Sequence, residues 1–403
     1  MLRKMDEVKV LRDPIHGYIQ VRYEVIWNCI NSKEFQRLRR IRQLGGSFMV
    51  YPTAEHSRIS HSLGVYEIVR RMCEENQSIS NGLSEEEKVV VMLAGLTHDI
   101  GHGPYSHAFE SVSAVHHEEF TYRILTQDSE IHQILESFKN GLSQEVAAVI
   151  NHTHPNSLLT QMISAQLDAD RMDYLLRDAY FTGTKYGEFD LERILRTLRV
   201  KDGKLVVKES AIHAVEDYIM ARYHMYWQVY YHPISRSYEA VLSALFKRLR
   251  DCKKENLAIL DEVPMFKSLI LEEELSISEH FLLDESACLY GFSQLVKGTD
   301  AIAKDLASRL LHRKLFDYVD LIGDEHKEKL LKLVENRNLD TRYYLSFDEV
   351  KQRPYQPYQQ KEDVAVWVLL EDGSICELSE RSVIVSALND GKQKNDIKAF
   401  LPK

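Results

Sequence analysis

Residues 96–110, LTHDIGHGPYSHAFE, carry three histidines and two acids directly after the apolar run VVVMLAG at 89–95. An apolar run of that kind predicts a buried helix, which the glycines and Pro104 of the following segment end. Neutral imidazoles and carboxylates are ligands that divalent metals take in proteins. Because His98 and Asp99 stand where this helix ends and both side chains can turn to one ion, the sequence predicts a metal site there.

Two further segments offer ligands for the same ion. His61 lies within EHSRISHSLGVYE at 55–67, and Asp170 lies within QLDADRMDYLLRDAYFTG at 166–183. Two histidines and two carboxylates leave coordination positions open for water and a phosphate oxygen, which favours a Lewis-acid site over a structural one. The candidate ligands are His61, His98, Asp99 and Asp170. These residue types admit Mn, Mg, Fe, Zn or Ni.

A His-Asp dipeptide alone is a weak signal, because such pairs are more often hydrogen-bonded groups of a core or a surface. The distribution of histidines strengthens the metal interpretation, since seven of the 17 histidines fall between His56 and His117. So many titratable groups within one short span indicate where the chemistry should be sought.

Helical periodicity dominates the elements that must position these groups. Apolar residues recur at three- and four-residue spacing in the segments 62–72, 85–96, 145–152 and 222–250. Asp-Gly pairs typical of β-hairpins occur within 200–207 and 364–378. Polar stretches at 250–256 and 351–363 predict connections. We therefore predict a mainly α fold in three parts: an N-terminal segment (1–50), a helical core (51–250), and a smaller α+β C-terminal region with a β-hairpin (251–403).

Composition narrows the classes of function. The 403 residues are 44% hydrophobic and 28% charged, as in ordinary globular proteins. The net charge of -10 argues against general affinity for nucleic acid or an anionic membrane. No apolar run reaches the roughly 20 residues that span a bilayer, and the N-terminus lacks the apolar core of a signal peptide. The five scattered cysteines form no CxxC pair, which indicates reduced thiols and a cytoplasmic protein.

Several motifs occur together and in order. They are DPIHGYI (13–19), EFQRLRRIRQLGG (34–46), SRISHSLGVYE (57–67), HDIGHGPYSH (98–107), HHE (116–118) and DADRMDYLLRDAYFTG (168–183). Over roughly residues 9–250 the chain resembles the HD-domain deoxynucleoside triphosphate triphosphohydrolases (dNTPases), whereas the last 150 or so residues resemble them only loosely. The resemblance implies an HD-domain helical core and assigns the metal to the four ligands named above.

Enzymes of this family cut a dNTP at the α-phosphate and release a deoxynucleoside and intact triphosphate. That reaction needs an electrophile at the phosphoryl oxygens, an oriented water and an acid for the departing 5′-oxygen. By resemblance, His107 is the proton donor, and Glu110 orients its ring from the same helical face. His102 and His117 are implied to contact phosphate or assist His107, and His116 is expected at the surface.

The resemblance also implies a site for the phosphates. Arg58 and Arg222 are expected to bind them, because a guanidinium gives planar, charge-assisted pairing and keeps its charge. Lys185 adds another charge. Arg222, Tyr226 and Tyr230 follow one another at four-residue spacing and predict a polar-aromatic pocket wall, although such a stripe is more often a packed helix face.

The deoxyribose is expected beside a second set of residues. By resemblance, Tyr174 stacks under the sugar, and Gln43 and Leu44 leave no room for a 2′-hydroxyl. Asp178, on the same helix face as Tyr174, accepts the 3′-hydroxyl. Tyr231 stands where the mammalian members have Gln near the base, so base preference does not transfer.

A second nucleotide site is predicted near the N-terminus. Segment 31–46 combines an apolar stripe with four arginines, a pattern that is usually a solvated helix face. The resemblance implies instead that it binds an activating guanine nucleotide, dGTP or GTP, at the interfaces of a homotetramer. The implied residues are Lys9, Val10, Asn31, Gln36 and Arg39. Asn31 stands where mammalian members have Asp, and because an amide has only one accepting oxygen the choice of activator stays open.

Two other functions remain open. An HD phosphohydrolase for a guanosine polyphosphate, cyclic nucleotide or nucleoside monophosphate would share the metal ligands without needing Tyr174, Asp178 and Arg222 in helical register. A catalytically silent nucleotide-sensing scaffold would need neither the metal ligands nor a proton donor. Because both sets are present, the sequence favours dNTP hydrolysis with a divalent metal.

Overall fold

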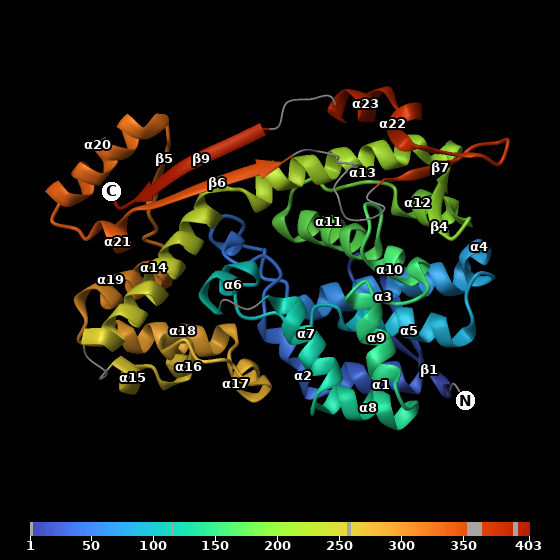
Figure 1. Cartoon of the computed structure of the whole chain (residues 1–403), viewed down its shortest axis with the longest axis horizontal. Coiled ribbons are helices and arrows are strands. Elements are labelled where there is room, and N and C mark those ends of the chain that lie inside the picture. The colour runs from blue at the N-terminus through green and yellow to red at the C-terminus, as the bar shows by residue number, and fades with distance from the viewer. Residues whose placement is uncertain (1–2, 114–115, 256–258, 353–364, 390–393) are drawn as a thin grey trace.

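The structure is a computed structural model that describes residues 3–113, 116–255, 259–352, 365–389 and 394–403. Helices make up most of these residues, and three small sheets accompany them. In Figure 1 the N- and C-terminal ends lie on opposite sides of the molecule along its longest axis. The predicted mainly α fold with an α+β C-terminal region is confirmed. No helix among the described residues is both long and apolar enough to cross a membrane.

The chain opens with a β-hairpin that the sequence analysis did not predict. β1 (Lys4–Asp13) pairs antiparallel with β2 (Gly17–Tyr23), and Asp13 lies opposite Gly17 across the turn. Gly17 has a left-handed φ of +73°, which glycine adopts without steric cost. The available sequence signal for this turn was the four-residue span from Pro14 to Gly17, because proline and glycine are typical of turns. The next elements are α1 (Glu24–Asn31), α2 (Lys33–Arg37), η1 (Leu38–Arg40) and η2 (Ser47–Met49).

Helix α5 (Glu85–Thr97) is the buried helix predicted from the apolar run. It begins at a capping box, because the Ser84 side chain accepts a hydrogen bond from Glu87 N and the Glu87 carboxylate accepts one from Ser84 N. Every residue from Val89 to Thr97 is buried. The helix therefore delivers the residues after Thr97 into the interior of the protein.

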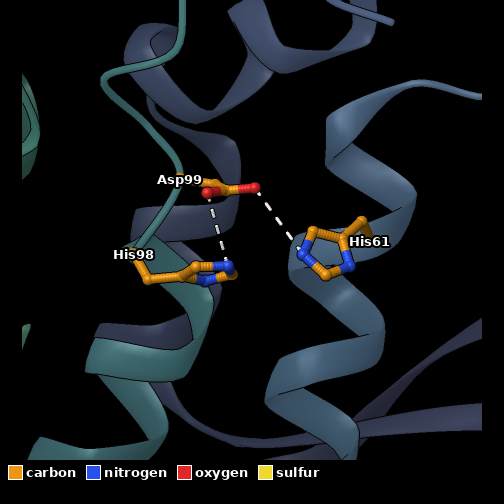
Figure 2. A group of neighbouring side chains, drawn as sticks. All are labelled: His61, His98 and Asp99. Carbon is orange, nitrogen blue, oxygen red and sulfur yellow. Dashed lines mark ion pairs between the residues drawn. The ribbon is translucent and has the colours of Figure 1, made fainter. Parts of the chain in front are cut away.

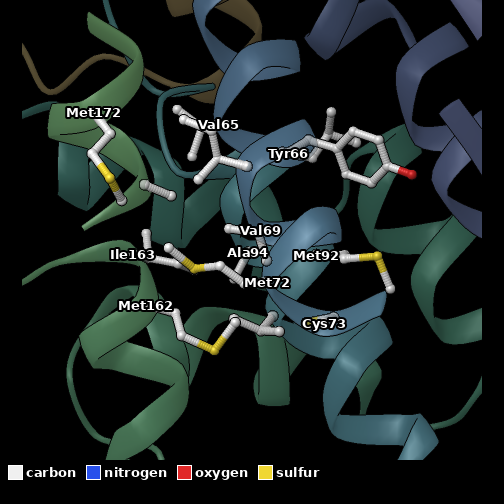
Figure 3. Packing of buried hydrophobic residues seen from close by; sticks show 14 of the residues in the cluster. Val65, Tyr66, Val69, Met72, Cys73, Met92, Ala94, Met162, Ile163 and Met172 are labelled. Carbon is white, nitrogen blue, oxygen red and sulfur yellow. The ribbon is translucent and has the colours of Figure 1, made fainter. Parts of the chain in front are cut away.

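Helix α3 (Arg58–Glu75) packs closely on α5 in the first hydrophobic core. A Cβ atom at Gly95 would lie 3.1 Å from Val69 Cγ2, so the glycine permits this approach. Figure 3 shows Val65, Val69 and Met72 of α3 in this core with Ala94 of α5. The other helices of this part are α4 (Gln77–Ser80), α6 (His107–Ser113), α7 (His117–Thr126), α8 (Glu130–Phe138), α9 (Leu142–Ile150), α10 (Ser157–Ile163) and α11 (Ala169–Thr182).

A four-stranded sheet joins segments that are far apart in the sequence. Its strands are β3 (Leu198–Lys201), β4 (Lys204–Lys208), β7 (Trp367–Leu369) and β8 (Ile375–Glu377), in that order. β3–β4 and β7–β8 are the two hairpins predicted from Asp-Gly pairs, and both are confirmed. β4 pairs parallel with β7, so strands from before and after residue 250 belong to one sheet. The division at residues 50 and 250 stays a prediction.

The second hydrophobic core lies along α14 (Pro233–Glu255), which contributes Val241, Leu245 and Leu249. β9 (Lys394–Leu401) is the middle strand of the third sheet, between β5 (Asp317–Asp320) and β6 (Ser346–Gln352). The remaining elements are α12 (Leu191–Thr197), η3 (Glu209–Ala211), α13 (Ile212–Met225), α15 (Ile259–Glu262), η5 (Pro264–Phe266), α16 (Lys267–Leu271), α17 (Ile277–Leu282), α18 (Glu285–Leu295), α19 (Ala301–Leu311), β5 (Asp317–Asp320), α20 (Gly323–Asn336), α21 (Thr341–Tyr344), β6 (Ser346–Gln352), α22 (Leu378–Arg381) and α23 (Val383–Asn389).

The segment 222–250, predicted as helical throughout, is interrupted. α13 ends at Met225, a π-helical turn, η4 (Tyr226–Tyr230), follows, and α14 starts at Pro233. Proline lacks an N–H donor and disfavours helical backbone at the residue before it, so one helix does not run through this point. Tyr226 and Tyr230 lie in this π-helical turn, which is wider than the α-helical turn expected from their four-residue spacing with Arg222. Such turns are frequent at functional sites.

Candidate active site

The four predicted metal ligands come together from three helices. His61 lies in the first turn of α3, His98 and Asp99 follow the end of α5, and Asp170 lies in the first turn of α11. His61 Nε2 is 3.0 Å from Asp170 Oδ1 and 3.6 Å from Asp99 Oδ2. His98 Nε2 is 3.4 Å from Asp99 Oδ1 and 3.6 Å from Asp170 Oδ1. Figure 2 shows the side chains of His61, His98 and Asp99 turned toward one another.

Both histidines direct Nε2, whose lone pair a bound cation would take, toward the two carboxylates. His98 Nδ1 donates to the Gly95 carbonyl at 2.9 Å, and because a carbonyl only accepts, this nitrogen carries the proton. His61 Nδ1 donates in the same way to Asp173 Oδ2 at 2.8 Å. The buried His98 Nε2 has no hydrogen-bond partner among the described residues. Two imidazole lone pairs and two carboxylates form a donor set that fits a divalent metal ion.

The charges around this cluster favour a cation. Burial would raise the pKa of Asp99, but the neighbouring Arg58 guanidinium and His98 hold it well below its usual range. Burial likewise opposes charge on Asp170, but the adjacent imidazoles of His61 and His98 hold the pKa of Asp170 well below its usual range. Both carboxylates are therefore ionised at neutral pH, and burial in a low-dielectric interior makes a compensating positive charge strongly favourable.

Arg58, predicted to bind phosphate, lies against the metal cluster. Its side chain is buried, Nη1 donates to Asp99 Oδ2, and Nε donates to Ser106 Oγ at 2.9 Å. The guanidinium thus bridges the predicted ligand Asp99 and the turn that precedes α6. A phosphate that approaches the cluster therefore comes close to the positive charge of Arg58.

A strained turn leads from the metal ligands to α6. Tyr105 and Ser106 have positive φ angles of 61° and 55°, which cost non-glycine residues free energy and occur mostly where the surroundings enforce them. Ser106 Oγ donates to the Arg42 carbonyl at 2.8 Å, and Tyr105 N donates to Glu285 Oε1 at 3.3 Å. These contacts hold the turn, and α6 begins with His107 directly after it.

His102 and His117 lie beside the metal cluster as a stacked pair. Their ring centroids are 3.7 Å apart with 13° between the planes, and His102 Nε2 is 3.3 Å from Asp99 Oδ1. A Cβ atom at Gly101 would lie 2.1 Å from the His117 carbonyl, so glycine lets α7 approach this loop. Burial, and then the charges of Arg58 and His117, lower the pKa of His102 well below its usual value. His102 is therefore neutral at physiological pH.

Glu110 contacts His117 directly. His117 Nδ1 is 2.6 Å from Glu110 Oε1, and the more exposed His116 has its Nδ1 3.1 Å from Glu110 Oε2. The His116 side chain is 83% exposed, as expected for a surface histidine. The side chain of His107 lies outside the described residues, so its contact with Glu110 stays a prediction.

The two carboxylate oxygens of Asp178 are both occupied by donors. His56 Nε2 lies 2.8 Å from Oδ1, and the Tyr230 hydroxyl donates to Oδ2 at 2.8 Å. Burial and the Asp178 charge raise the pKa of Tyr230 well above its ordinary value, so the hydroxyl keeps its proton. Tyr174 packs edge-on against Tyr230, with ring centroids 6.0 Å apart. The sequence analysis missed His56, because no motif or spacing linked it to Asp178.

The predicted pocket wall lies against α11 and the segment before it. Arg222 Nη1 donates to Gln166 Oε1 at 2.5 Å, and its guanidinium lies 5.8 Å from the Tyr226 ring centre. Tyr226 and Tyr230 contact each other edge to face at 5.1 Å. Tyr174 lies between this wall and the metal cluster, since its ring centroid is 6.5 Å from that of His61.

The other three predicted substrate residues have different environments. Gln43 is largely buried, its backbone N donates to the His56 carbonyl at 3.0 Å, and its Oε1 has no partner among the described residues. Leu44 packs at the edge of the first core. Lys185 is exposed in the loop after α11, and the described contacts do not join it to the other pocket residues.

The residues predicted to bind an activating nucleotide lie at or near the surface. Gln36 Nε2 donates to the Ile30 carbonyl at 2.7 Å, and Arg39 Nε donates to Gln36 Oε1 at 2.8 Å. Asn31 Nδ2 donates to a carbonyl of its own helix, that of Trp27, at 2.7 Å. On β1, Lys9 pairs with Glu7 at 3.0 Å and Val10 is 52% exposed.

A cavity of about 860 Å³ lies elsewhere, between the end of α3 and α12. Its charged lining residues are Arg71, Glu75, Asp190, Glu192, Arg193, Arg196 and Arg199. None of them is a predicted site residue, and the three carboxylates nearly balance the four arginines. We place the candidate active site at the metal cluster, where ligands with free lone pairs lie beside groups that suit proton transfer.

Similar proteins have related sequences and folds. The HD domain model matches residues 58–178, and the HD associated region matches residues 189–398. The uncharacterized protein YwfO of Bacillus subtilis is 43% identical over 99% of this chain and 93% of its own length. A Dictyostelium discoideum protein, the deoxynucleoside triphosphate triphosphohydrolase SAMHD1 homolog, is 29% identical over 59% of this chain and 49% of its own length.

A solved structure supports the same relationship. The crystal structure of a phosphohydrolase from Bacteroides thetaiotaomicron has a TM-score of 0.86 and 27% identity, covering 98% of this chain and 100% of that one. The matched HD domain contains the four residues of the metal cluster, of which His61, His98 and Asp99 form a group that could hold a metal ion. The family predicted from the sequence motifs is thereby confirmed: this chain belongs to the HD-domain phosphohydrolases and carries their associated region.

Proposed function

We propose that this protein is a metal-dependent dNTP triphosphohydrolase, which converts a dNTP and water to a deoxynucleoside and triphosphate. The observation that carries this proposal is the convergence of His61 Nε2 and His98 Nε2 with Asp99 and Asp170, beside the ring of Tyr174. The substrate class is further supported by relatives named deoxynucleoside triphosphate triphosphohydrolases in Dictyostelium discoideum and chicken.

The reaction forms a bond from a water oxygen to the α-phosphorus while the bond to the 5′-oxygen breaks. His61, His98, Asp99 and Asp170 would hold a divalent ion, which would supply a Lewis acid that withdraws negative charge from the phosphoryl oxygens. His107 donates the proton that the departing 5′-oxygen requires. Glu110 holds the His117 ring through their 2.6 Å contact, and His117 and the neutral His102 contact the phosphates.

Substrate positioning uses groups on both sides of the cluster. Arg58 and Arg222 pair with phosphate oxygens, and Lys185 adds charge from the loop after α11. On the sugar side, Asp178 accepts the 3′-hydroxyl in place of one of its two present donors, His56 or Tyr230. Tyr174 lies under the deoxyribose, and Gln43 and Leu44 exclude a 2′-hydroxyl.

Regulation is part of the proposal. A guanine nucleotide, dGTP or GTP, binds at Lys9, Val10, Asn31, Gln36 and Arg39 and orders a homotetramer in which hydrolysis is switched on. The exposure of Val10 and the hydrogen-bonded pair of Gln36 and Arg39 support a ligand-accessible surface there.

Product analysis tests the proposed reaction. Purified protein with Mn²⁺ or Mg²⁺ is incubated with each dNTP, alone and with dGTP or GTP, and deoxynucleoside, triphosphate and pyrophosphate are measured. We expect deoxynucleoside and intact triphosphate, lost in His98→Ala. Monophosphate with pyrophosphate would move the attack to another bond and contradict the role of His107. No turnover of any dNTP, with turnover of another nucleotide, would favour a different HD phosphohydrolase.

A further inference from the structure

The turn of the N-terminal hairpin sends two side chains into the protein interior. Asp13 ends β1 and His16 precedes β2, and the His16 side chain is only 1% exposed. Asp13 Oδ1 accepts hydrogen bonds from the backbone N–H groups of Ile15 and His16, both at 2.9 Å. This local bonding fixes the shape of the turn and therefore the direction in which His16 points.

His16 contacts the buried carboxylate of Asp173 on α11 directly, whereas Asp13 is linked to it through Arg177. His16 Nε2 donates to Asp173 Oδ1 at 2.6 Å. Arg177, on the next turn of α11, donates from Nε to Asp173 Oδ2 and from Nη2 to Oδ1, each at 2.8 Å. Arg177 Nη1 donates to Asp13 Oδ2, also at 2.8 Å. Asp13, His16 and Arg177 thus enclose Asp173 from the hairpin side.

The remaining contact of Asp173 is with a metal ligand. Asp173 Oδ2 accepts the Nδ1 proton of His61 at 2.8 Å, so the His61 Nε2 lone pair faces Asp99 and Asp170. The backbone of α3 makes room for this arrangement, because a Cβ atom at Gly64 would lie 1.8 Å from Asp173 Oδ1. A carboxylate that receives the second ring N–H of a ligating histidine fixes its tautomer and orientation and raises its basicity.

The local charge explains why the network needs the hairpin. Two carboxylates, Asp13 and Asp173, face the single guanidinium of Arg177, so one negative charge remains beside the His61 ring. Burying that charge is costly unless its oxygens are fully hydrogen-bonded. Asp173 Oδ1 has two donors: Arg177 lies on α11 itself, and His16 lies outside it. Without His16, Asp173 Oδ1 keeps only its hydrogen bond from Arg177, and the orientation of the carboxylate toward His61 depends on that one guanidinium.

We propose that the hairpin turn is a working part of the metal centre, in which His16 and Asp173 are positioning residues that hold His61 in its ligating orientation. The inference rests on the metal site of the proposed function and deepens it. β1 also carries Lys9 and Val10. A ligand or subunit that shifts β1 would therefore also shift the hairpin turn, whose His16 supports His61 through Asp173.

Metal binding tests this inference independently of substrate turnover. Mn²⁺ is titrated into metal-free protein, and unbound Mn²⁺ is measured by electron paramagnetic resonance. His16→Leu keeps a side chain of moderate size but removes the donor, and we expect the affinity for Mn²⁺ to be about 10- to 100-fold lower. His16→Gln retains an N–H donor near the position of Nε2 and should recover most of the affinity. His213→Gln is the matched control, because the His213 side chain is 96% exposed and distant in the sequence.

The outcomes separate this inference from the proposed function. Wild-type affinity in His16→Leu, with an unchanged melting curve, would overturn the positioning role and leave dNTP hydrolysis intact. Equal losses in His16→Leu and His16→Gln, matched by equal losses of melting temperature, would also overturn it by showing a purely structural role. Metal binding that is weakened only in His16→Leu supports the inference even if no dNTP is hydrolysed. A wild-type protein that binds no metal would contradict both.

Discussion

Arg37 Nη1 donates a 2.7 Å hydrogen bond to the backbone carbonyl of His102. Its Nη2 donates to the Leu283 carbonyl at 2.5 Å, so one buried guanidinium ties the loop after α5 to the residue that follows α17. Burial lowers the pKa of Arg37 to about 9, which leaves it charged at neutral pH. The loop that carries His102 is therefore supported by a cation from the N-terminal part of the chain.

Replacement of Arg37 with Met should destabilise the protein. The apolar side chain removes the hydrogen bonds that Arg37 donates to two buried carbonyls, and the loss of a buried hydrogen bond of this kind costs about 1–3 kcal/mol. We expect the free energy of unfolding in urea to fall by about 2 kcal/mol or more. Arg39→Ala is the control, since Arg39 is exposed and bonds only Gln36 among the described residues. Equal stability of both variants would contradict the structural role of Arg37.

Arg39→Ala should instead affect activation. If a guanine nucleotide binds beside Gln36 and Arg39, loss of the guanidinium removes a charge-assisted contact to it. We expect dGTP or GTP no longer to stimulate dNTP hydrolysis, while the metal content stays at the wild-type value. Activity with and without activator, together with metal analysis of the same preparation, checks this. Stimulation equal to that of the wild type would exclude Arg39 from the activating site.

Removal of metal should lower both activity and thermal stability. An ion that binds only the folded state at 100 times its dissociation constant stabilises that state by about 2.7 kcal/mol. Chelator-treated protein should melt at a lower temperature and recover when Mn²⁺ is added. His98→Ala should melt at the same temperature with or without Mn²⁺, whereas His213→Ala should respond as the wild type does. A response in His98→Ala would remove His98 from the ligand set.

Glu110→Gln should slow turnover more than it weakens substrate binding. The substitution keeps the shape and an accepting oxygen but removes the negative charge that lies 2.6 Å from His117 Nδ1. We expect kcat to fall about 10- to 100-fold, as general acid–base residues contribute on that scale or above it, with KM nearly unchanged. Glu118→Gln, an exposed position on α7, serves as the control. A change in KM alone would assign Glu110 to binding.

Asp300 should make stability depend on pH in the acid range. Burial would raise the pKa of Asp300, but hydrogen bonds from Arg248 and from Ala303 N outweigh it and hold the pKa below its ordinary value. The unfolded chain then binds the proton more tightly, so this contribution is complete above the ordinary pKa and is lost as the pH falls through the folded one.

Asp300→Asn tests this dependence. Asn still caps α19 but loses the ion pair with Arg248, so the loss of stability at pH 7 should be near 1 kcal/mol and should vanish at low pH. Urea unfolding between about pH 3 and 7 measures the difference. A difference that is the same at every pH would show that the charge of Asp300 contributes nothing.

Local signals predicted much of the fold. The capped apolar run became α5, and the Asp-Gly pairs became the β3–β4 and β7–β8 turns, because these features depend only on neighbouring residues. The N-terminal hairpin was missed, since β1 is mostly exposed and its polar residues give little alternation. The β4–β7 pairing could not be predicted, because nothing in either strand specifies a partner some 160 residues away.

The candidate site was predicted unevenly for a similar reason. Imidazoles and carboxylates that bind a metal carry a chemical signature, so His61, His98, Asp99 and Asp170 were recognisable as a set. Asp173 and His56 were not, because a carboxylate or histidine that acts through another side chain looks like any other buried polar residue until the fold brings the two together.

The parallel pairing of β4 with β7 has a consequence for synthesis of the chain. Val368, Leu378 and Val385 belong to the same hydrophobic core as α3 and α5. When the helices that carry the metal ligands leave the ribosome, the last strands of their core have not been translated. Contacts between such distant residues form late and slowly, and the incomplete core exposes apolar surface in the meantime. The part of the chain that carries the candidate metal site therefore reaches its final packing only when translation is almost finished, and nascent chains that stop short of Trp367 are candidates for chaperone binding.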